Sequence, residues 1–158
     1  MPRVVLFQPQ IPPNTGNVAR TCAATACELH LVEPLGFCID DRQLRRAGLD
    51  YWPLVPLHRH ASWQAFLEHR NERGGRLLAF SSHGQQPFQR LRYAVDDWLL
   101  FGRESDGLPR HALSHADDVA RIPMAGAVRS LNLSVSVGVA LFEALRQLGQ
   151  LDEVSSCV

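Results

Sequence analysis

Short apolar runs alternate along the chain with segments whose apolar positions recur at helical spacing. The runs are rich in aliphatic and aromatic residues and stop at polar, glycine or proline positions, which is typical of buried strands. The predicted strands are residues 4–7, 29–32, 55–60, 77–80, 98–101 and 119–122. The predicted helices are residues 18–27, 40–48, 63–74, 109–114 and 131–148. Continuous apolar strands between helices predict a Rossmann-like α/β fold, with a mostly parallel sheet covered by helices on both faces.

The length of 158 residues corresponds to one domain, which we place at residues 1–150, followed by a loose tail at 151–158. There is no apolar run of signal-peptide or transmembrane length, so a cytoplasmic protein without membrane contact is expected. The four cysteines are scattered, which favours free thiols in a reducing compartment. Cys22 and Cys27 lie in a small-residue helix and are predicted to be buried packing groups.

The formal charge is zero, from 16 basic and 16 acidic residues, and all the basic residues are arginine. This balance excludes a uniformly basic nucleic-acid binder, and the lack of lysine excludes a Walker A loop or a lysine nucleophile. The charge is unevenly distributed, because residues 42–76 hold seven arginines against three acids and residues 80–158 hold seven against nine. The stretch at 42–76 is therefore a predicted contact for RNA.

Three loops that follow predicted strands hold the candidate chemistry, because ligands of parallel α/β folds bind beyond the carboxyl ends of the strands. In the loop at residues 11–20, Gly16 permits close backbone approach, and Arg20 is expected about one and a half turns into the helix, near the mouth of a site. The alternative for this loop is a capped helix with a surface arginine.

The second and third loops are also polar at the predicted sheet edge. Residues 101–109 hold four consecutive polar residues between two glycines, and the alternative is a turn whose carboxylates cap the next helix. Residues 122–134 form a Gly/Ala-rich loop that leads to Ser130, Asn132 and Ser134 at a helix start, and the alternative is an ordinary N-cap.

Other common sites are absent from the sequence. There is no G-x-G-x-x-G dinucleotide fingerprint and no G-x-S-x-G nucleophile elbow. The seven histidines are dispersed along the chain, and His58, His60 and His69 are predicted to lie on solvated faces, so no metal site is expected.

Four strings occur together in order: PQIPPNTGNVAR, EPLGFCIDDRQLRRAGLDY, LLFGRESDGLP and RIPMAGAVRSLNLSVSVGVALFEALRQLG. As a set they resemble the SPOUT superfamily of RNA methyltransferases and, within it, the tRNA wobble-nucleotide 2′-O-methyltransferases of the TrmL type. The resemblance implies a fold that general topology rules disfavour, a deep C-terminal trefoil knot made from about Phe80 onward. It also implies a homodimer whose site is completed by the second subunit, S-adenosylmethionine as methyl donor, and the tRNA anticodon stem-loop as substrate.

The resemblance assigns site residues by position. Those implied to contact the cofactor are Phe80, Gly102, Ile122, Ser130 and Leu131. Those implied to be catalytic are Arg20, Asn14, Glu104, Ser130 and Asn132. Arg20 corresponds to the arginine near the target 2′-hydroxyl. Because an arginine is too basic to accept a proton, we expect it to polarise the hydroxyl and orient phosphate, with Glu104 as the rival acid–base candidate.

The predicted function is therefore methylation of the 2′-oxygen of the wobble nucleotide, cytidine or uridine 34. Two alternatives stay open at this point. One is a related 2′-O-methyltransferase acting at another tRNA or rRNA site, and the other is a non-catalytic RNA-binding module.

Overall fold

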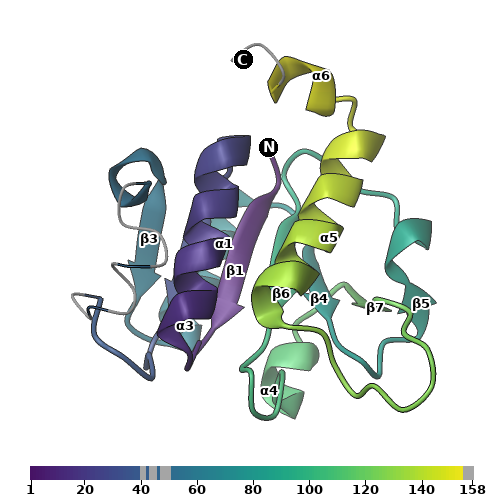
Figure 1. Ribbon diagram of the computed structural model, residues 1–158. Coiled ribbons are helices and arrows are strands. Elements are labelled where there is room, and N and C mark those ends of the chain that lie inside the picture. The colour runs from purple at the N-terminus through teal and green to yellow at the C-terminus, as the bar shows by residue number, and fades with distance from the viewer. Residues whose placement is uncertain (40–41, 43–45, 47–50, 155–158) are drawn as a thin grey trace.

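The computed structural model describes residues 1–39, 42, 46 and 51–154. Within them strands and helices mostly alternate along the chain, except that β5 follows β4 and α6 follows α5 (Figure 1). The strands are β1 (Arg3–Phe7), β2 (Leu29–Val32), β3 (Leu57–His60), β4 (Leu77–Phe80), β5 (Gln86–Pro87), β6 (Trp98–Phe101) and β7 (Asp118–Arg121). The helices are α1 (Pro12–Thr25), α3 (Trp63–Arg73), α4 (Arg110–Leu113), α5 (Leu133–Gln147) and α6 (Leu151–Val154), with short 3-10 turns η1 (Trp52–Leu54) and η2 (Phe88–Arg90).

The seven strands form one sheet in the order β3-β2-β1-β6-β4-β7-β5, and every pairing between them is parallel. The predicted parallel α/β architecture is therefore confirmed. Because all strands run in one direction, the carboxyl ends of β4, β6 and β7 meet at the same edge of the sheet. The loops that follow Phe80, Phe101 and Arg121 are consequently brought together there.

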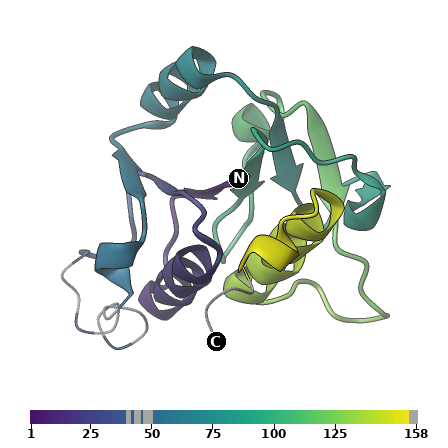
Figure 2. The ribbon, with the colours of Figure 1, turned by 90° about the horizontal axis from the view of Figure 1, so that it is seen from above.

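Helices cover both faces of the sheet because the strands are apolar on both sides. Along β1, Val4 and Leu6 belong to one buried cluster, and Val5 and Phe7 belong to a second cluster on the opposite face. The first cluster packs against α1 and α5, and the second packs against α3 and α4. Figure 2 shows α1 and α5 side by side on one side of the sheet and α3 on the other.

Helix α1 begins earlier than the sequence predicted. It starts at Pro12, so Arg20 lies about two turns into the helix rather than one and a half. Proline suits the first helical turn, where its missing N–H has no intrahelical partner and its fixed φ is already helical. Asn14 and Thr15 are therefore helical residues and not caps.

The other helix boundaries follow the expected capping chemistry. The Ser62 side chain accepts a hydrogen bond from the backbone N–H of Ala65, and Gly74 ends α3 with a positive φ of 70°. Asn132 caps α5 by accepting from the N–H of Ser134. Of the helix predicted at residues 40–48, only residues 42 and 46 are described by the structure. Cys157 also lies outside the described residues.

Cys22 and Cys27 are buried, as predicted, and both are free thiols. Residues 151–154 form α6, in a segment for which a loose tail was predicted. Among the described residues, no helix combines the length and apolar character needed to cross a lipid bilayer.

The prediction that His58, His60 and His69 lie on solvated faces was wrong for His60, which is buried, and for His69, which is half-buried, whereas the His58 side chain is 39% exposed. They gather with His30 in a cluster between β2, β3 and α3, in which His30 is fully buried and His60 is 7% exposed. The His30 ring stacks on His58 with centroids 4.5 Å apart and lies 5.2 Å from His60. Desolvation by burial is the main cause that lowers the pKa of His30 to about 3 and that of His60 to about 4. Parallel pairing of two distant strands creates this cluster, which spacing along the chain could not reveal.

Candidate active site

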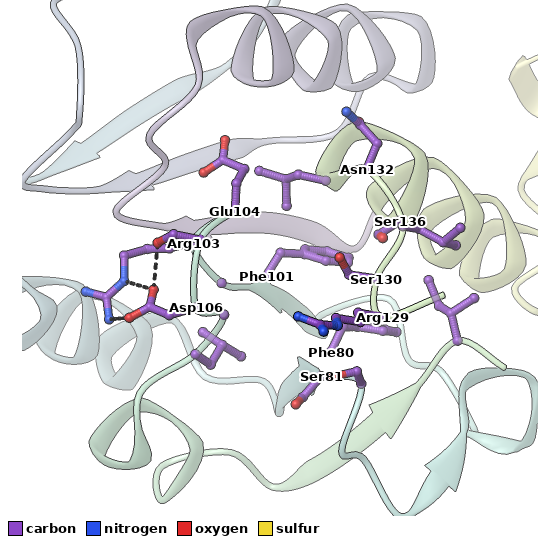
Figure 3. Close-up of a pocket in the computed structure, with 18 of the residues that line it drawn as sticks. Phe80, Ser81, Phe101, Arg103, Glu104, Asp106, Arg129, Ser130, Asn132 and Ser136 are labelled. Carbon is purple, nitrogen blue, oxygen red and sulfur yellow. Dashed lines mark hydrogen bonds and ion pairs between the residues drawn. The ribbon is translucent and has the colours of Figure 1, made fainter. Parts of the chain in front are cut away.

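A cavity of about 580 Å³ lies at the carboxyl ends of β4, β6 and β7, where the sheet edge meets the start of α5 (Figure 3). Its walls are the loops at residues 80–83, 101–108 and 122–133, with Ile11 and Asn14 from the start of α1. Pockets of several hundred Å³ are the usual size for small ligands and cofactors. The cavity therefore has the volume and the position expected of a ligand site in this fold.

Eight of the nine candidate site residues line this cavity: Asn14, Phe80, Gly102, Glu104, Ile122, Ser130, Leu131 and Asn132. They come from four separate segments of the chain. The parallel sheet brings these segments together because each one follows or adjoins a strand that ends at the same edge.

Glu104 joins the loop after β6 to the beginning of α1. Its carboxylate accepts hydrogen bonds from the backbone N–H of Gln10 at 2.8 Å and of Ile11 at 3.1 Å, and the Asn14 side-chain amide donates to it at 3.5 Å. These N–H groups precede or open the helix, where intrahelical acceptors are missing. Glu104 thus takes the place of a side-chain N-cap, which Ile11 cannot supply.

The same chain of hydrogen bonds continues to α5. The Asn132 amide donates to Asn14 Oδ1 at 2.9 Å, and Asn132 Oδ1 accepts from the Ser134 N–H at 2.9 Å and the Ser134 hydroxyl at 2.7 Å. Each group in this series is held by a neighbour on a different element. The series Glu104–Asn14–Asn132 therefore sets the relative position of α1, the loop after β6 and α5 at the cavity wall.

The loop after β6 is closed on itself by an ion pair. The Arg103 guanidinium donates to both carboxylate oxygens of Asp106, at 2.7 and 2.9 Å (Figure 3). It also donates to Gln8 Oε1 at 2.8 Å. The Arg103 hydrogen bond is the main cause that lowers the pKa of the Asp106 carboxyl. The positive charge of Arg103 is thus neutralised within its own loop.

Two stacked phenyl rings form an apolar part of the cavity. Phe80 and Phe101 are register partners at the ends of β4 and β6, and their rings are 4.7 Å apart and nearly parallel, at 9°. The sequence reasoning missed Phe101 and Arg129, which also line the cavity. Phe101 could have been found from its position directly before Gly102, at the end of a strand pairing with β4. For Arg129, the only indication in the sequence was its position directly before the candidate residue Ser130.

The comparisons with known proteins agree on one family. The profile of the SpoU rRNA Methylase family matches residues 1–142. This chain belongs to the SpoU rRNA Methylase family. A tRNA (cytidine(34)-2′-O)-methyltransferase of Polaromonas sp. is 50% identical over 149 residues, covering 92% of this chain and 90% of the relative.

Solved structures extend the match to three dimensions. One, solved for a study of 2-OH methylation of C/U34 on tRNA, has a TM-score of 0.90 and 52% identity, and covers 94% of this chain and 97% of its own. A second, an AdoMet-bound rRNA methyltransferase from Sinorhizobium meliloti, has a TM-score of 0.86 and 30% identity, and covers 93% of this chain and 56% of its own.

Arg20 is the one candidate residue that does not line the cavity of this SpoU-family chain. It is exposed on α1, and its guanidinium lies over the Tyr51 ring, 4.9 Å from the ring centroid. The expectation that Arg20 would lie near the mouth of a site counted the helical turns from the expected cap residues at 14–17, whereas the helix begins at Pro12. Within one chain the structure places Arg20 on the surface, where a second molecule can reach it.

Proposed function

We propose that this protein transfers the methyl group of S-adenosylmethionine to the 2′-oxygen of nucleotide 34, the wobble nucleotide, in the tRNA anticodon stem-loop. The observation that carries the proposal is the cavity that gathers eight candidate residues at the carboxyl edge of the sheet. It is supported by the 50% identity to a tRNA (cytidine(34)-2′-O)-methyltransferase along almost the full length of both chains.

The residues of the cavity fit S-adenosylmethionine. Phe80, Ile122 and Leu131 offer apolar surface for an adenine ring, and Gly102 and Ser130 expose backbone and hydroxyl groups that can bind its polar edges. The sulfonium carries a positive charge, and the Arg103–Asp106 ion pair keeps one nearby cation neutralised. When bound, the cofactor supplies an electrophilic methyl group. The protein's part is to hold the 2′-oxygen in line with it.

Gly102→Ala is expected to weaken S-adenosylmethionine binding about tenfold. A Cβ on Gly102 would lie 2.3 Å from the carbonyl carbon of Gly107 and 2.4 Å from the nitrogen of Leu108, so the loop must move. Overpacking of this kind costs about 1–3 kcal/mol. Isothermal titration calorimetry measures the affinity. Gly138→Ala is the matched control, because its Cβ would meet nothing within 4 Å, and unchanged affinity in Gly102→Ala would contradict the assignment.

Arg20 is proposed to act on the 2′-hydroxyl in a homodimer, from the subunit opposite the cavity that it serves. Its guanidinium donates hydrogen bonds to the developing oxyanion and to a neighbouring phosphate, and the proton leaves to water or a phosphate oxygen. Exposed apolar side chains near the cavity and along α5 support an interface between two chains: Leu131, Val135 and Phe142, at 36%, 50% and 47% exposed. Asn14 and Asn132 orient the groups around the cavity.

The arginine-rich stretch at 42–76 contributes less free charge than its composition indicates. Four of its seven arginines form ion pairs with acids outside the stretch: Arg59 with Glu33, Arg70 with Asp117, Arg73 with Glu28 and Arg76 with Asp97. Arg42 and Arg46 are exposed, and Arg45 lies outside the described residues. We therefore restrict the proposed tRNA contact to Arg42 and Arg46, together with Arg129 at the cavity.

A methylation assay with nucleotide mapping tests the proposed function. Purified protein is incubated with labelled S-adenosylmethionine and unmodified tRNA, and the methylated nucleotide is located by mass spectrometry. Label on the ribose of nucleotide 34 is the expected result. Label at another tRNA nucleotide would contradict the wobble assignment. A parallel reaction with rRNA tests the related methyltransferase, and tRNA binding in a filter assay without any label transfer would indicate a non-catalytic module.

Two further features remain predictions. One is the deep trefoil knot from Phe80 onward, which the position of α5 beside the loops after β4 and β6 supports. The other is the cytoplasmic location, where tRNA is modified.

A further inference from the structure

The histidine cluster lies away from the cavity, on the other half of the sheet. His30 stands on β2, His58 and His60 on β3, and His69 on α3. The centroids of the His30, His60 and His69 rings are 5.1–5.6 Å from one another. In Figure 1, β3 lies on the opposite side of β1 from β4, β6 and β7. The proposed methyl transfer gives these imidazoles no role.

Three ring nitrogens converge in this cluster. His30 Nδ1 and His60 Nε2 are 2.9 Å apart, and His30, His60 and His69 each place one potential ligand nitrogen within 4.8 Å of the others. His69 Nε2 is buried and has no hydrogen-bond partner among the residues that the structure describes. A single proton can satisfy the His30–His60 pair, but it leaves the third nitrogen without a partner. Buried polar atoms are nearly always satisfied, so this nitrogen is available to a ligand.

The outer ring nitrogen of His30 has the partner that a metal-bound imidazole usually has. Glu28 Oε2 lies 3.1 Å from His30 Nε2, and Arg73 holds the Glu28 carboxylate with two hydrogen bonds, at 2.5 and 2.9 Å. With Nε2–H donating to Glu28, the lone pair of His30 Nδ1 points toward His60 Nε2. A carboxylate that orients a histidine in this way is the common outer support of zinc sites.

We propose that His30, His60 and His69 bind one divalent metal ion that prefers imidazole, of which Zn²⁺ is the best match. Tetrahedral Zn²⁺ takes nitrogen ligands at about 2.0–2.1 Å, so the nitrogens need to be about 3.3 Å apart. The 2.9 Å His30–His60 pair opens slightly on binding, and the His60 proton moves from Nε2 to Nδ1, so that both imidazoles ligate the ion in their neutral form. Water or His58 completes the coordination. The ion joins α3 to the edge strand β3, a structural role separate from the cavity.

Metal titration of the full-length protein tests this site. After chelator treatment and dialysis, the protein is titrated with Zn²⁺ against a chromogenic chelator, and with Co²⁺ to detect the visible absorption bands of a tetrahedral site. We expect one Zn²⁺ per chain, tetrahedral Co²⁺ bands and a higher melting temperature with Zn²⁺. Absence of stoichiometric binding would overturn the proposal. Neither RNA nor a methyl donor is present, so the result is independent of the proposed function.

Variants assign the ligands. His69→Gln is expected to weaken Zn²⁺ binding at least about 100-fold and to remove the Co²⁺ bands, because two ligands remain. His115→Gln is the matched control: His115 is exposed and bonded to the His111 carbonyl, and binding is expected to be unchanged. Wild-type affinity in His69→Gln would refute the site. If that variant does not fold, Glu28→Gln provides the test. Its Zn²⁺ affinity is expected to be about 10–100-fold lower than that of the wild type, and an unchanged affinity would refute the proposal.

Discussion

Arg20→Ala is expected to slow single-turnover methyl transfer about 10²–10³-fold while leaving S-adenosylmethionine affinity unchanged. Removing one preorganised donor to a developing oxyanion has an effect of this size. The affinity is preserved because Arg20 does not line the cavity and its guanidinium lies over Tyr51 instead. Rapid-quench assays with saturating tRNA measure the rate, and calorimetry measures cofactor affinity.

The control for this variant is Arg92→Ala. Arg92 is exposed and lies near the amino end of β6, at the opposite end of the strand from the cavity, so its loss should leave the rate unchanged. Full single-turnover activity in Arg20→Ala would refute the assigned role.

Mixed dimers test whether Arg20 serves the partner's cavity. When Arg20→Ala and Gly102→Ala chains are combined, one site of the heterodimer pairs an intact cavity with an intact arginine from the other chain. Recovery of activity above that of either variant alone is expected if the arginine acts across the interface. No recovery would show that each chain uses its own Arg20, or that the chains do not assemble.

Glu104→Ala is expected to lower the free energy of unfolding by about 2 kcal/mol and to weaken cofactor binding about 30-fold. The substitution removes the acceptor of the Gln10 and Ile11 N–H groups and breaks the link through Asn14 to Asn132. Hydrogen bonds to charged groups contribute about 1.5–3 kcal/mol, and 1.4 kcal/mol changes affinity tenfold. Urea unfolding and calorimetry measure the two effects.

Glu104→Gln separates an anchoring role from acid–base catalysis. The amide oxygen can still accept a hydrogen bond, so we expect partial recovery of stability and a pH–rate profile of unchanged shape. Loss of one limb of the profile would instead identify Glu104 as the proton carrier. Glu68→Ala controls for removal of a carboxylate, because Glu68 is exposed on α3 and bonded to Gln64.

The sequence by itself determined most of the elements and most of the cavity. The apolar runs at β1, β2, β4 and β6 are buried on both faces, so composition alone marked them as parallel strands. Once the strands are parallel, the loops after Phe80 and Phe101 must meet at one edge. Residues next to those strand ends, such as Gly102 and Glu104, could therefore be predicted without coordinates.

Tertiary structure decided the features that depend on contacts between distant segments. The N–H groups of Gln10 and Ile11, which precede α1, find their acceptor in Glu104, more than 90 positions later in the chain. How many arginines of residues 42–76 stay unpaired depends on acids outside this stretch, such as Glu28 and Asp117. The burial of His30 and His60 depends on the pairing of β2 with β3. The spacing of residues along the chain carries no information on these contacts between distant segments. They are stabilised only in the folded protein, where the assembled sheet and its helices exclude water from them.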